Sequence, residues 1–322
     1  MNLPRPLTAD QMAFFEREGY IVIEDVLTDD DIQPVVDEIT EEIDIRARAL
    51  VQEGKLSRPY DEHDFEHRLV RIAEETDEVH DSIRAGQLSG PALFNLIRHP
   101  RLLDIAEQFC GPELIGSSLY RLRPKLPGNR ISVVPWHQDS GYAEAFCDQY
   151  LMLTFWIAFV DATEENGCMW VRPGSHKHGI LTHARRDRDR PYLVVPARFH
   201  PSDQPPVCVP VRKGGVLLMT NLTLHAGFEN RSDAVRWSMD VRYQSAALPT
   251  NAPIRRLENE VVSSDVDGVP PACHPPEADF LLRSQARPDD VVTDPVQFRR
   301  IREQHMGARF TSGDRWNMVV GD

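Results

Sequence analysis

The sequence predicts a mainly β protein with helices, built around an antiparallel sandwich or jelly roll. Three observations support this fold class. Short runs of β-branched and aromatic residues alternate with turn clusters over residues 114–247. No helical pattern separates these runs, as parallel βαβ units would require. Residues 1–113 instead carry helical periodicity, so we expect helices packed on one face of the sheet.

The first 46 residues predict a helix, a strand and a second helix. Thr8 and Gln11 can form a capping box at the start of the first helix, which we expect to end at Gly19. The β-branched run 20–23 follows as a short strand. Thr28 and the three aspartates after it then predict the start of the second helix, because carboxylates interact favourably with the helix dipole.

Residues 47–113 are charged and mostly helical in pattern. Apolar faces on either side of Pro100 predict two helices, the second ending near Gly111. The polar part of this segment contains three histidines among many carboxylates. No helical pair with a third ligand stands apart from those carboxylates, so we expect a solvated face there and not a metal site (His63, His67 and His80).

Seven runs in the β region are expected to form strands. Clusters such as Pro-Gly-Asn at 127–129 and Lys-Gly-Gly at 213–215 provide the turns between them. The tail, 248–322, is rich in proline, which favours extended or turning chain, and only 295–304 has a helical pattern. The expected strands lie at 114–122, 132–135, 151–160, 169–171, 207–211, 216–220 and 238–243.

Composition narrows the class of protein. The chain has 322 residues, of which 41% are hydrophobic and 27% charged, as in globular proteins. Its net charge of −14 disfavours a nucleic-acid partner. No apolar run has the length of a membrane span or of a signal peptide, so we expect a cytoplasmic protein without a membrane partner. Five cysteines without a CxxC pair indicate neither a disulfide framework nor a thiolate zinc site.

The most informative residues are two histidines, an aspartate and an arginine. His137 and Asp139 are two apart, so on a strand both side chains would lie on one face, although alone this motif is weak. Further along, a strand leads to His225, and Arg236 follows eleven residues later. Two histidines and one carboxylate can bind Fe(II) with open coordination sites. Arginine suits the far carboxylate of a 2-oxoglutarate cosubstrate, and Ser238 would share its face.

With these residues in place, the chain resembles the phytanoyl-CoA dioxygenase family of Fe(II)/2-oxoglutarate-dependent oxygenases. The resemblance implies a double-stranded β-helix core in which His137, Asp139 and His225 bind iron and Arg236 binds 2-oxoglutarate, with O2 as the second cosubstrate. It covers roughly residues 8–247 in the family's order, through 8–23, Lys-Leu-Pro-Gly at 125–128, His137-Gln138-Asp139, Glu-Asn-Gly-Cys at 165–168, Pro-Gly-Ser-His at 173–176, and His225, Asn230 and Arg236.

The resemblance extends to further positions. Trp156 matches a tryptophan that lines the cosubstrate pocket, although core packing explains it equally well, and Arg121 matches a contact on the strand before the metal motif. Relatives often have serine where this chain has Gly227, so that contact is absent or replaced, with Ser238 a candidate. We expect one oxygenase domain over 1–322, with a helical part at 1–113, the β core at 114–247 and a proline-rich extension at 248–322.

The implied activity is that of a hydroxylase that oxidises a small molecule and releases succinate and CO2. The intact carboxylate at Asp139 disfavours the related halogenases, in which a small residue takes that place. Four arginines at 184–191 could meet an anionic substrate, or pair with the neighbouring aspartates in solvent. The alternatives are an inactive jelly-roll relative that acts as a binding protein, and a hydroxylase of protein or nucleic acid.

Overall fold

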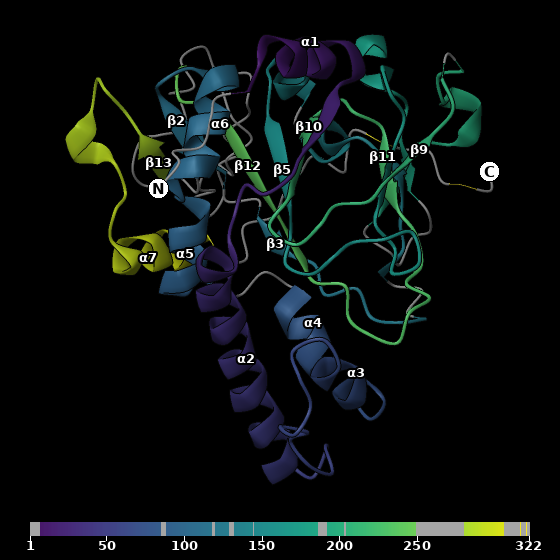
Figure 1. Ribbon diagram of the computed structural model, residues 1–322, viewed down its shortest axis with the longest axis vertical. Helices are drawn as coiled ribbons and strands as arrows, with labels where there is room; N and C mark the ends of the chain where they lie inside the picture. Colours follow the sequence, from purple (N-terminus) through teal and green to yellow (C-terminus); the bar gives the residue numbers. More distant parts are fainter. Residues whose placement is uncertain are drawn as a thin grey trace, which may run out of the picture.

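The structure is a computed structural model, and within it two antiparallel β-sheets pack against each other with helices outside the larger sheet (Figure 1). This arrangement confirms the predicted mainly β fold with helices. Residues 186–191, which include three of the four arginines of the arginine-rich loop, lie outside the described part, as does most of the proline-rich extension. The structure describes residues 7–84, 88–117, 120–128, 132–143, 145–185, 192–202, 204–248, 280–305, 316 and 320.

The N-terminal elements follow the predicted order and begin at the predicted residues. Both capping boxes form, with the side chains of Thr8 and Thr28 accepting hydrogen bonds from the backbone N–H groups of Gln11 and Asp31. Gly19 ends the first helix with φ of 77°, a left-handed conformation that glycine adopts readily. The elements are α1 (Ala9–Glu18), β1 (Tyr20–Ile23) and α2 (Asp29–Gln52).

Helices also fill much of the next segment, as predicted. Pro100 begins a helix, because its missing N–H would have no intrahelical partner at that position, and Gly111 caps the end of the same helix. The tail helix predicted at 295–304 is present. The remaining helices are α3 (Arg68–Ala73), α4 (Glu78–Arg84), α5 (Pro91–Ile97), α6 (Pro100–Cys110) and α7 (Pro295–His305).

The larger sheet has seven strands in the order β1-β10-β5-β12-β2-β13, with β3 also paired to β12. The smaller sheet has the order β4-β11-β6-β9, and β7 pairs with β8 separately. The strands are β2 (Leu114–Gly116), β3 (Arg121–Leu122), β4 (Val134–His137), β5 (Leu153–Ala158), β6 (Met169–Val171), β7 (Ala184–Arg185), β8 (Leu193–Val194), β9 (Val207–Val209), β10 (Val216–Thr220), β11 (His225–Gly227), β12 (Ser238–Ser245) and β13 (Phe280–Arg283).

Two strand predictions need correction. The run 114–122 is not one strand, because β2 and β3 pair with different parts of β12. The tail also contributes a strand that was not predicted, since Phe280 pairs with Gly116 of β2. A side chain at Gly116 would collide with the Phe280 ring, so the small residue on β2 makes room for this distant partner. Long-range pairing of this kind leaves no local signal in a proline-rich segment.

Side chains of the central strands alternate between two environments. On β5, Phe155 and Ile157 belong to the helix-side core, whereas Trp156 and Ala158 belong to a cluster between the two sheets. Strand β12 alternates in the same way, with Met239, Val241 and Tyr243 toward the helices and Ser238, Asp240 and Arg242 on the other face. The large sheet therefore carries an apolar core on one face and polar side chains on the other.

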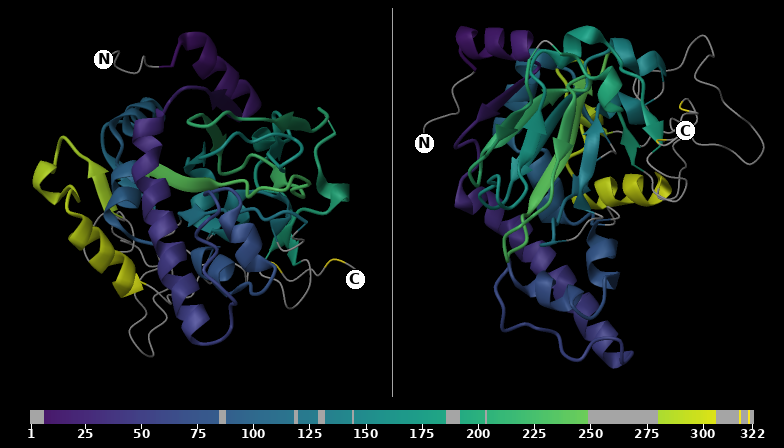
Figure 2. Two further views of the ribbon diagram at one scale, coloured as in Figure 1. Left: turned by 60° about the horizontal axis from the view of Figure 1, so that its bottom comes forward. Right: turned by 90° about the vertical axis from the view of Figure 1, so that its right-hand side faces the viewer.

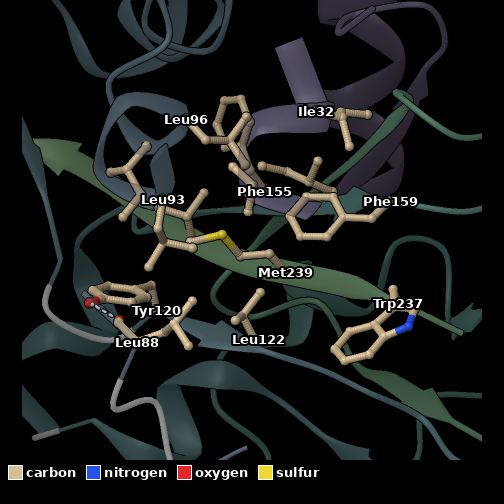
Figure 3. Packing of buried hydrophobic residues seen from close by; sticks show 14 of the residues in the cluster. Ile32, Leu88, Leu93, Leu96, Tyr120, Leu122, Phe155, Phe159, Trp237 and Met239 are labelled. Atoms are coloured by element: carbon tan, nitrogen blue, oxygen red, sulfur yellow. Dashed lines mark hydrogen bonds between the residues drawn. The ribbon is translucent and has the colours of Figure 1, made fainter. Parts of the chain in front are cut away.

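In the helix-side core, the N-terminal helices pack against the large sheet (Figure 3). Leu93 and Leu96 of α5 lie close to Met239 and Phe155 in this view. Trp237 stacks on Phe65 with ring centroids 4.6 Å apart and donates a hydrogen bond to the Phe65 carbonyl. In the left view of Figure 2, most of the strands lie to the right of α2. Among the helices described, none is both long and apolar enough to cross a membrane.

Candidate metal centre

Two histidines face each other across neighbouring strands of the smaller sheet. In the register of β4 and β11, His225 lies opposite His137, and the ring centroids are 4.2 Å apart. Each ring contacts the carbonyl two residues earlier through Nδ1, at Pro135 for one and Thr223 for the other, both at 2.8 Å. A ring that donates from Nδ1 has its Nε2 lone pair available for a metal ion.

Asp139 completes this group from a turn and not from the strand. Strand β4 ends at His137, and Asp139 begins a 3-10 helix, η2 (Asp139–Tyr142), so the prediction that both side chains lie on one strand is wrong in that respect. Gln138 between them is still extended, with φ of −112° and ψ of 143°, so alternation of side chains persists. The Gln138 side chain points away and binds the backbone of Gly179, Leu181 and Leu222.

The three side chains converge on one point. Oδ1 of Asp139 lies 3.9 Å from Nε2 of His137 and 4.0 Å from Nε2 of His225, and all three side chains are buried. One potential ligand atom from each residue lies within 4.8 Å of the other two. Within the described residues this is the sole group of three or more such side chains arranged to hold a metal ion. These distances suit an ion placed between the three groups.

Two partners that the sequence analysis missed hold the aspartate in place. Arg242 donates from Nη2 to Oδ1 at 3.0 Å and from Nε to Oδ2 at 3.2 Å, and Thr154 donates to Oδ2 at 2.6 Å. Despite burial, the charge of Arg242 holds the pKa of Asp139 well below its usual range. Burial and the neighbouring His225 lower the pKa of His137, so the site presents a carboxylate beside a neutral imidazole.

A buried arginine, Arg236, lies on the cavity side of the large sheet, as Arg242 does. Arg236 is 3% exposed, and its Cζ lies 4.9 Å from the centroid of the Trp156 ring. Nη1 donates to the Ser238 hydroxyl at 2.5 Å, whereas Nε is buried without a hydrogen-bond partner. Burial lowers the pKa of Arg236 to about 9. A buried guanidinium with an unpartnered N–H suits a carboxylate ligand.

The space beside Gly227 is taken by a lysine. A Cβ at Gly227 would lie 3.3 Å from Nζ of Lys125, which donates a hydrogen bond to the Phe228 carbonyl. Lys125 thus occupies the space beside Gly227, and replacement of that contact by Ser238 stays a prediction. Burial and the nearby Arg236 lower the pKa of Lys125 to about 6.

The remaining predicted contact, Arg121, does not line the cavity that contains the metal group. Its Nη1 donates to the carbonyl of Tyr120 at 2.8 Å. Arg123, two residues later, lines the cavity instead and donates to Asp240 from Nε at 2.5 Å. Residues two apart on a strand share a face, so alternation does not separate Arg121 from Arg123, but β3 ends at Leu122 and Arg123 lies beyond the strand.

The cavity joins the metal group to the arginine pocket and carries an excess of basic side chains. Its lining includes His137, Asp139, His225, Trp156 and Arg236. Five basic side chains and two carboxylates line it among the described residues, in a chain whose net charge is −14. The lining residues are Arg84, Arg123, Pro124, Lys125, Ser132, Val134, His137, Asp139, Thr154, Trp156, Met169, Tyr192, Met219, His225, Gly227, Arg236, Asp240 and Arg242.

Known proteins share this sequence pattern and fold. The family model for phytanoyl-CoA dioxygenase (PhyH) matches residues 15–238. The phytanoyl-CoA dioxygenase of Arabidopsis thaliana is 27% identical over 77% of this chain and 98% of its own length. The peroxisomal enzyme of Rattus norvegicus is 26% identical over 74% and 69%. The crystal structure of the epimerase SnoN in complex with Fe3+, alpha ketoglutarate and nogalamycin RO matches with a TM-score of 0.54 at 21% identity, over 85% of this chain and 98% of that one.

Proposed function

Since the chain belongs to the phytanoyl-CoA dioxygenase family and is an Fe(II)/2-oxoglutarate-dependent dioxygenase, we propose that His137, Asp139 and His225 bind its iron. The observation that carries this proposal is the convergence of the two Nε2 atoms and the Asp139 carboxylate within 4.8 Å. Two imidazoles and one carboxylate are the ligand set of non-haem Fe(II) oxygenases, and they leave coordination sites for the cosubstrate and for O2.

Arg236 is our candidate for the far carboxylate of 2-oxoglutarate. Its unpartnered Nε and the Ser238 hydroxyl support this role, because a carboxylate would satisfy the buried donor and neutralise the buried charge. The Trp156 ring lies 4.9 Å from Cζ of Arg236 and would form an apolar wall for the carbon chain. Arg121 remains a weaker candidate, because it does not line the cavity.

When bound, iron and 2-oxoglutarate supply the activation of O2 and the oxidation of a C–H bond, with release of succinate and CO2. The chain contributes three things to this chemistry. Arg242 and Thr154 fix the Asp139 carboxylate, and the carbonyls of Pro135 and Thr223 fix the imidazole rings. Burial excludes bulk water from the ligands. The cavity in front of them then determines which carbon of a small-molecule substrate is presented.

Anaerobic titration of the full chain with Fe(II) tests the metal site. We expect His137→Ala, Asp139→Ala and His225→Ala each to weaken Fe(II) binding by at least about tenfold and to abolish succinate formation from 2-oxoglutarate. The matched control is His63→Ala, which changes a histidine outside the cavity. Thermal unfolding verifies that each variant is folded. Wild-type iron affinity in any of the three would remove that residue from the site.

The cosubstrate site has its own test. Arg236→Met should raise the 2-oxoglutarate concentration needed for half-saturation by about tenfold or more, with Fe(II) affinity unchanged. The control Arg212→Met removes an exposed guanidinium elsewhere on the surface. Unchanged cosubstrate dependence in Arg236→Met would contradict this assignment. A wild-type chain that binds 2-oxoglutarate but forms no succinate would instead favour the non-catalytic binding protein.

A further inference from the structure

Four polar side chains from separate segments lie at the outer part of the cavity. Arg84 comes from α4, Arg123 follows β3, Ser132 precedes β4, and Tyr192 precedes β8. We refer to these four residues as the rim cluster. The side chains of Arg84 and Arg123 are 28% and 33% exposed, whereas those of the metal group are 5–8% exposed. The two arginines of the rim cluster are therefore nearer to solvent than the metal group, while Ser132 is buried in the same cavity wall.

Contacts within the protein orient Arg84 and Arg123, but some N–H groups of each guanidinium are not used in these contacts. Arg84 donates from Nη1 to the Tyr192 hydroxyl at 2.9 Å. Arg123 uses Nε and Nη2 toward Asp240, at 2.5 and 3.3 Å. A guanidinium has five N–H donors, so each side chain keeps further N–H groups for a ligand. Orientation before binding lowers the entropy lost when a ligand is captured.

Ser132 supplies an independent sign of a ligand. The residue is 8% exposed and lines the cavity, and its Oγ is buried without a hydrogen-bond partner in the described part of the chain. Buried hydroxyl groups in folded proteins are nearly always hydrogen-bonded, so an unpartnered one at a cavity wall indicates that a partner arrives from the cavity. A hydroxyl beside two guanidinium groups suits an oxyanion as that partner.

Charge balance favours the same ligand. Arg242 is paired with Asp139 and Asp240. The two positive charges of Fe(II) balance the two negative charges of 2-oxoglutarate. Among the residues that the structure describes, Arg84 has only a distant carboxylate contact, 3.9 Å from its Nε to Asp81. The outer cavity therefore retains positive charge after the cofactors are accounted for, in a chain that is otherwise acidic.

We propose that the rim cluster binds an oxyanion of the substrate, a carboxylate or a phosphate ester, and that the enzyme thus selects small acidic molecules. This inference rests on the proposed function, because it places the remainder of the substrate toward the iron. Arg84, Arg123 and Ser132 would donate hydrogen bonds to the oxyanion, and the Tyr192 hydroxyl, which accepts from Arg84, would hold that guanidinium in position. The bond to be oxidised would lie deeper, in front of His137 and His225.

Paired ligands test this inference on the full chain loaded with Fe(II) and N-oxalylglycine under nitrogen. The probes are aromatic and aliphatic carboxylates and phosphate monoesters, each with its neutral amide or alcohol counterpart, measured by calorimetric titration. We expect the anions to bind more tightly than their neutral counterparts. Arg84→Met should weaken anion binding by about tenfold or more and leave the neutral probes unchanged. Ser132→Ala should show a smaller loss of the same kind.

The controls separate this inference from the proposed function. Arg212→Met should bind every probe as the wild type does, because that side chain is exposed and outside the cavity. The affinity for N-oxalylglycine, measured in the same preparations, should not change in Arg84→Met or Ser132→Ala. No preference for anions, or full preference in both variants, would overturn the role of the rim cluster. A wild-type chain that fails to bind N-oxalylglycine would instead contradict the proposed function itself.

Discussion

Removal of the guanidinium at Arg242 tests how the metal group is held in the absence of metal. The side chain makes three hydrogen bonds to carboxylates, two to Asp139 at 3.0 and 3.2 Å and one to Asp240 at 2.8 Å. Removing one partner of a buried ion pair costs about 3–5 kcal/mol. Asp240 keeps Arg123 and Asp139 keeps Thr154, so we expect the lower end, about 3 kcal/mol, for Arg242→Gln at pH 7.5.

The pH dependence of this loss follows from the pKa of Asp139. In the wild type its pKa is depressed, so the stability it contributes is present above the pKa of an unfolded aspartate, about 3.9, and is lost only as the pH falls below that. Without Arg242, burial dominates and raises the pKa of Asp139, so a proton can neutralise the carboxylate in mild acid. The difference between wild type and variant should therefore shrink between pH 7.5 and pH 5.5.

Urea unfolding of the metal-free chain, followed by tryptophan fluorescence and far-UV circular dichroism, measures both effects. Arg212→Gln is the surface control and should change the free energy of unfolding by no more than about 0.5 kcal/mol. A destabilisation below about 1 kcal/mol in Arg242→Gln at pH 7.5 would refute the reasoning. A difference in the free energy of unfolding between wild type and Arg242→Gln that stays constant down to pH 5.5 would refute it as well.

Three further substitutions test single contacts. Thr154→Val removes one hydrogen bond to Asp139 and should lower the free energy of unfolding by about 1 kcal/mol in urea, and no loss would contradict that contact. The pKa of Lys125, about 6 when folded, lies below that of an unfolded lysine, so the unfolded chain binds the extra proton between these values. The free energy of unfolding of the metal-free wild type should therefore rise from pH 6.5 to 8.5 relative to that of Lys125→Met, by up to about 1.4 kcal/mol per pH unit. Parallel curves of this free energy against pH for the two proteins would contradict the lowered pKa of Lys125. Trp237→Phe removes a donor to a backbone carbonyl and should cost about 1–2 kcal/mol in thermal or urea unfolding, whereas an unchanged midpoint would show that the bond contributes nothing.

Local sequence signals were sufficient for most of the fold. Capping at Thr8 and Thr28 depends on neighbouring residues alone, and both boxes were predicted correctly. The β13 strand was missed because its partner, β2, lies more than 160 residues earlier, and nothing in a proline-rich segment indicates such pairing. The turn that carries Asp139 was also missed, because His-x-Asp fits the end of a strand as well as its middle.

The site was predictable to the extent that it depends on residue type and spacing. His137, Asp139 and His225 come together as the motif suggested, and Arg236 lies buried in the same cavity. The support for Asp139 was missed, because Arg242 is 103 residues away in sequence. One signal was available, since Ser238, Asp240 and Arg242 alternate along β12 and so share a face, and Arg236 lies two residues before Ser238. Lys125 had no such signal, because its position depends on the missing side chain at Gly227.

Because side chains alternate along β12, one set of its residues faces the cavity and the other faces the helices. Asp240 and Arg242 line the cavity and Ser238 binds Arg236, whereas Met239, Val241 and Tyr243 belong to the helix-side core. A change at Ser238 therefore leaves the apolar packing of the helix side intact, whereas a change at Arg242 or Asp240 breaks the ion pairs that support Asp139. A protein engineer who varies the cavity-facing positions of the large sheet should therefore keep Thr154, Asp240 and Arg242, together with the helix-facing residues between them.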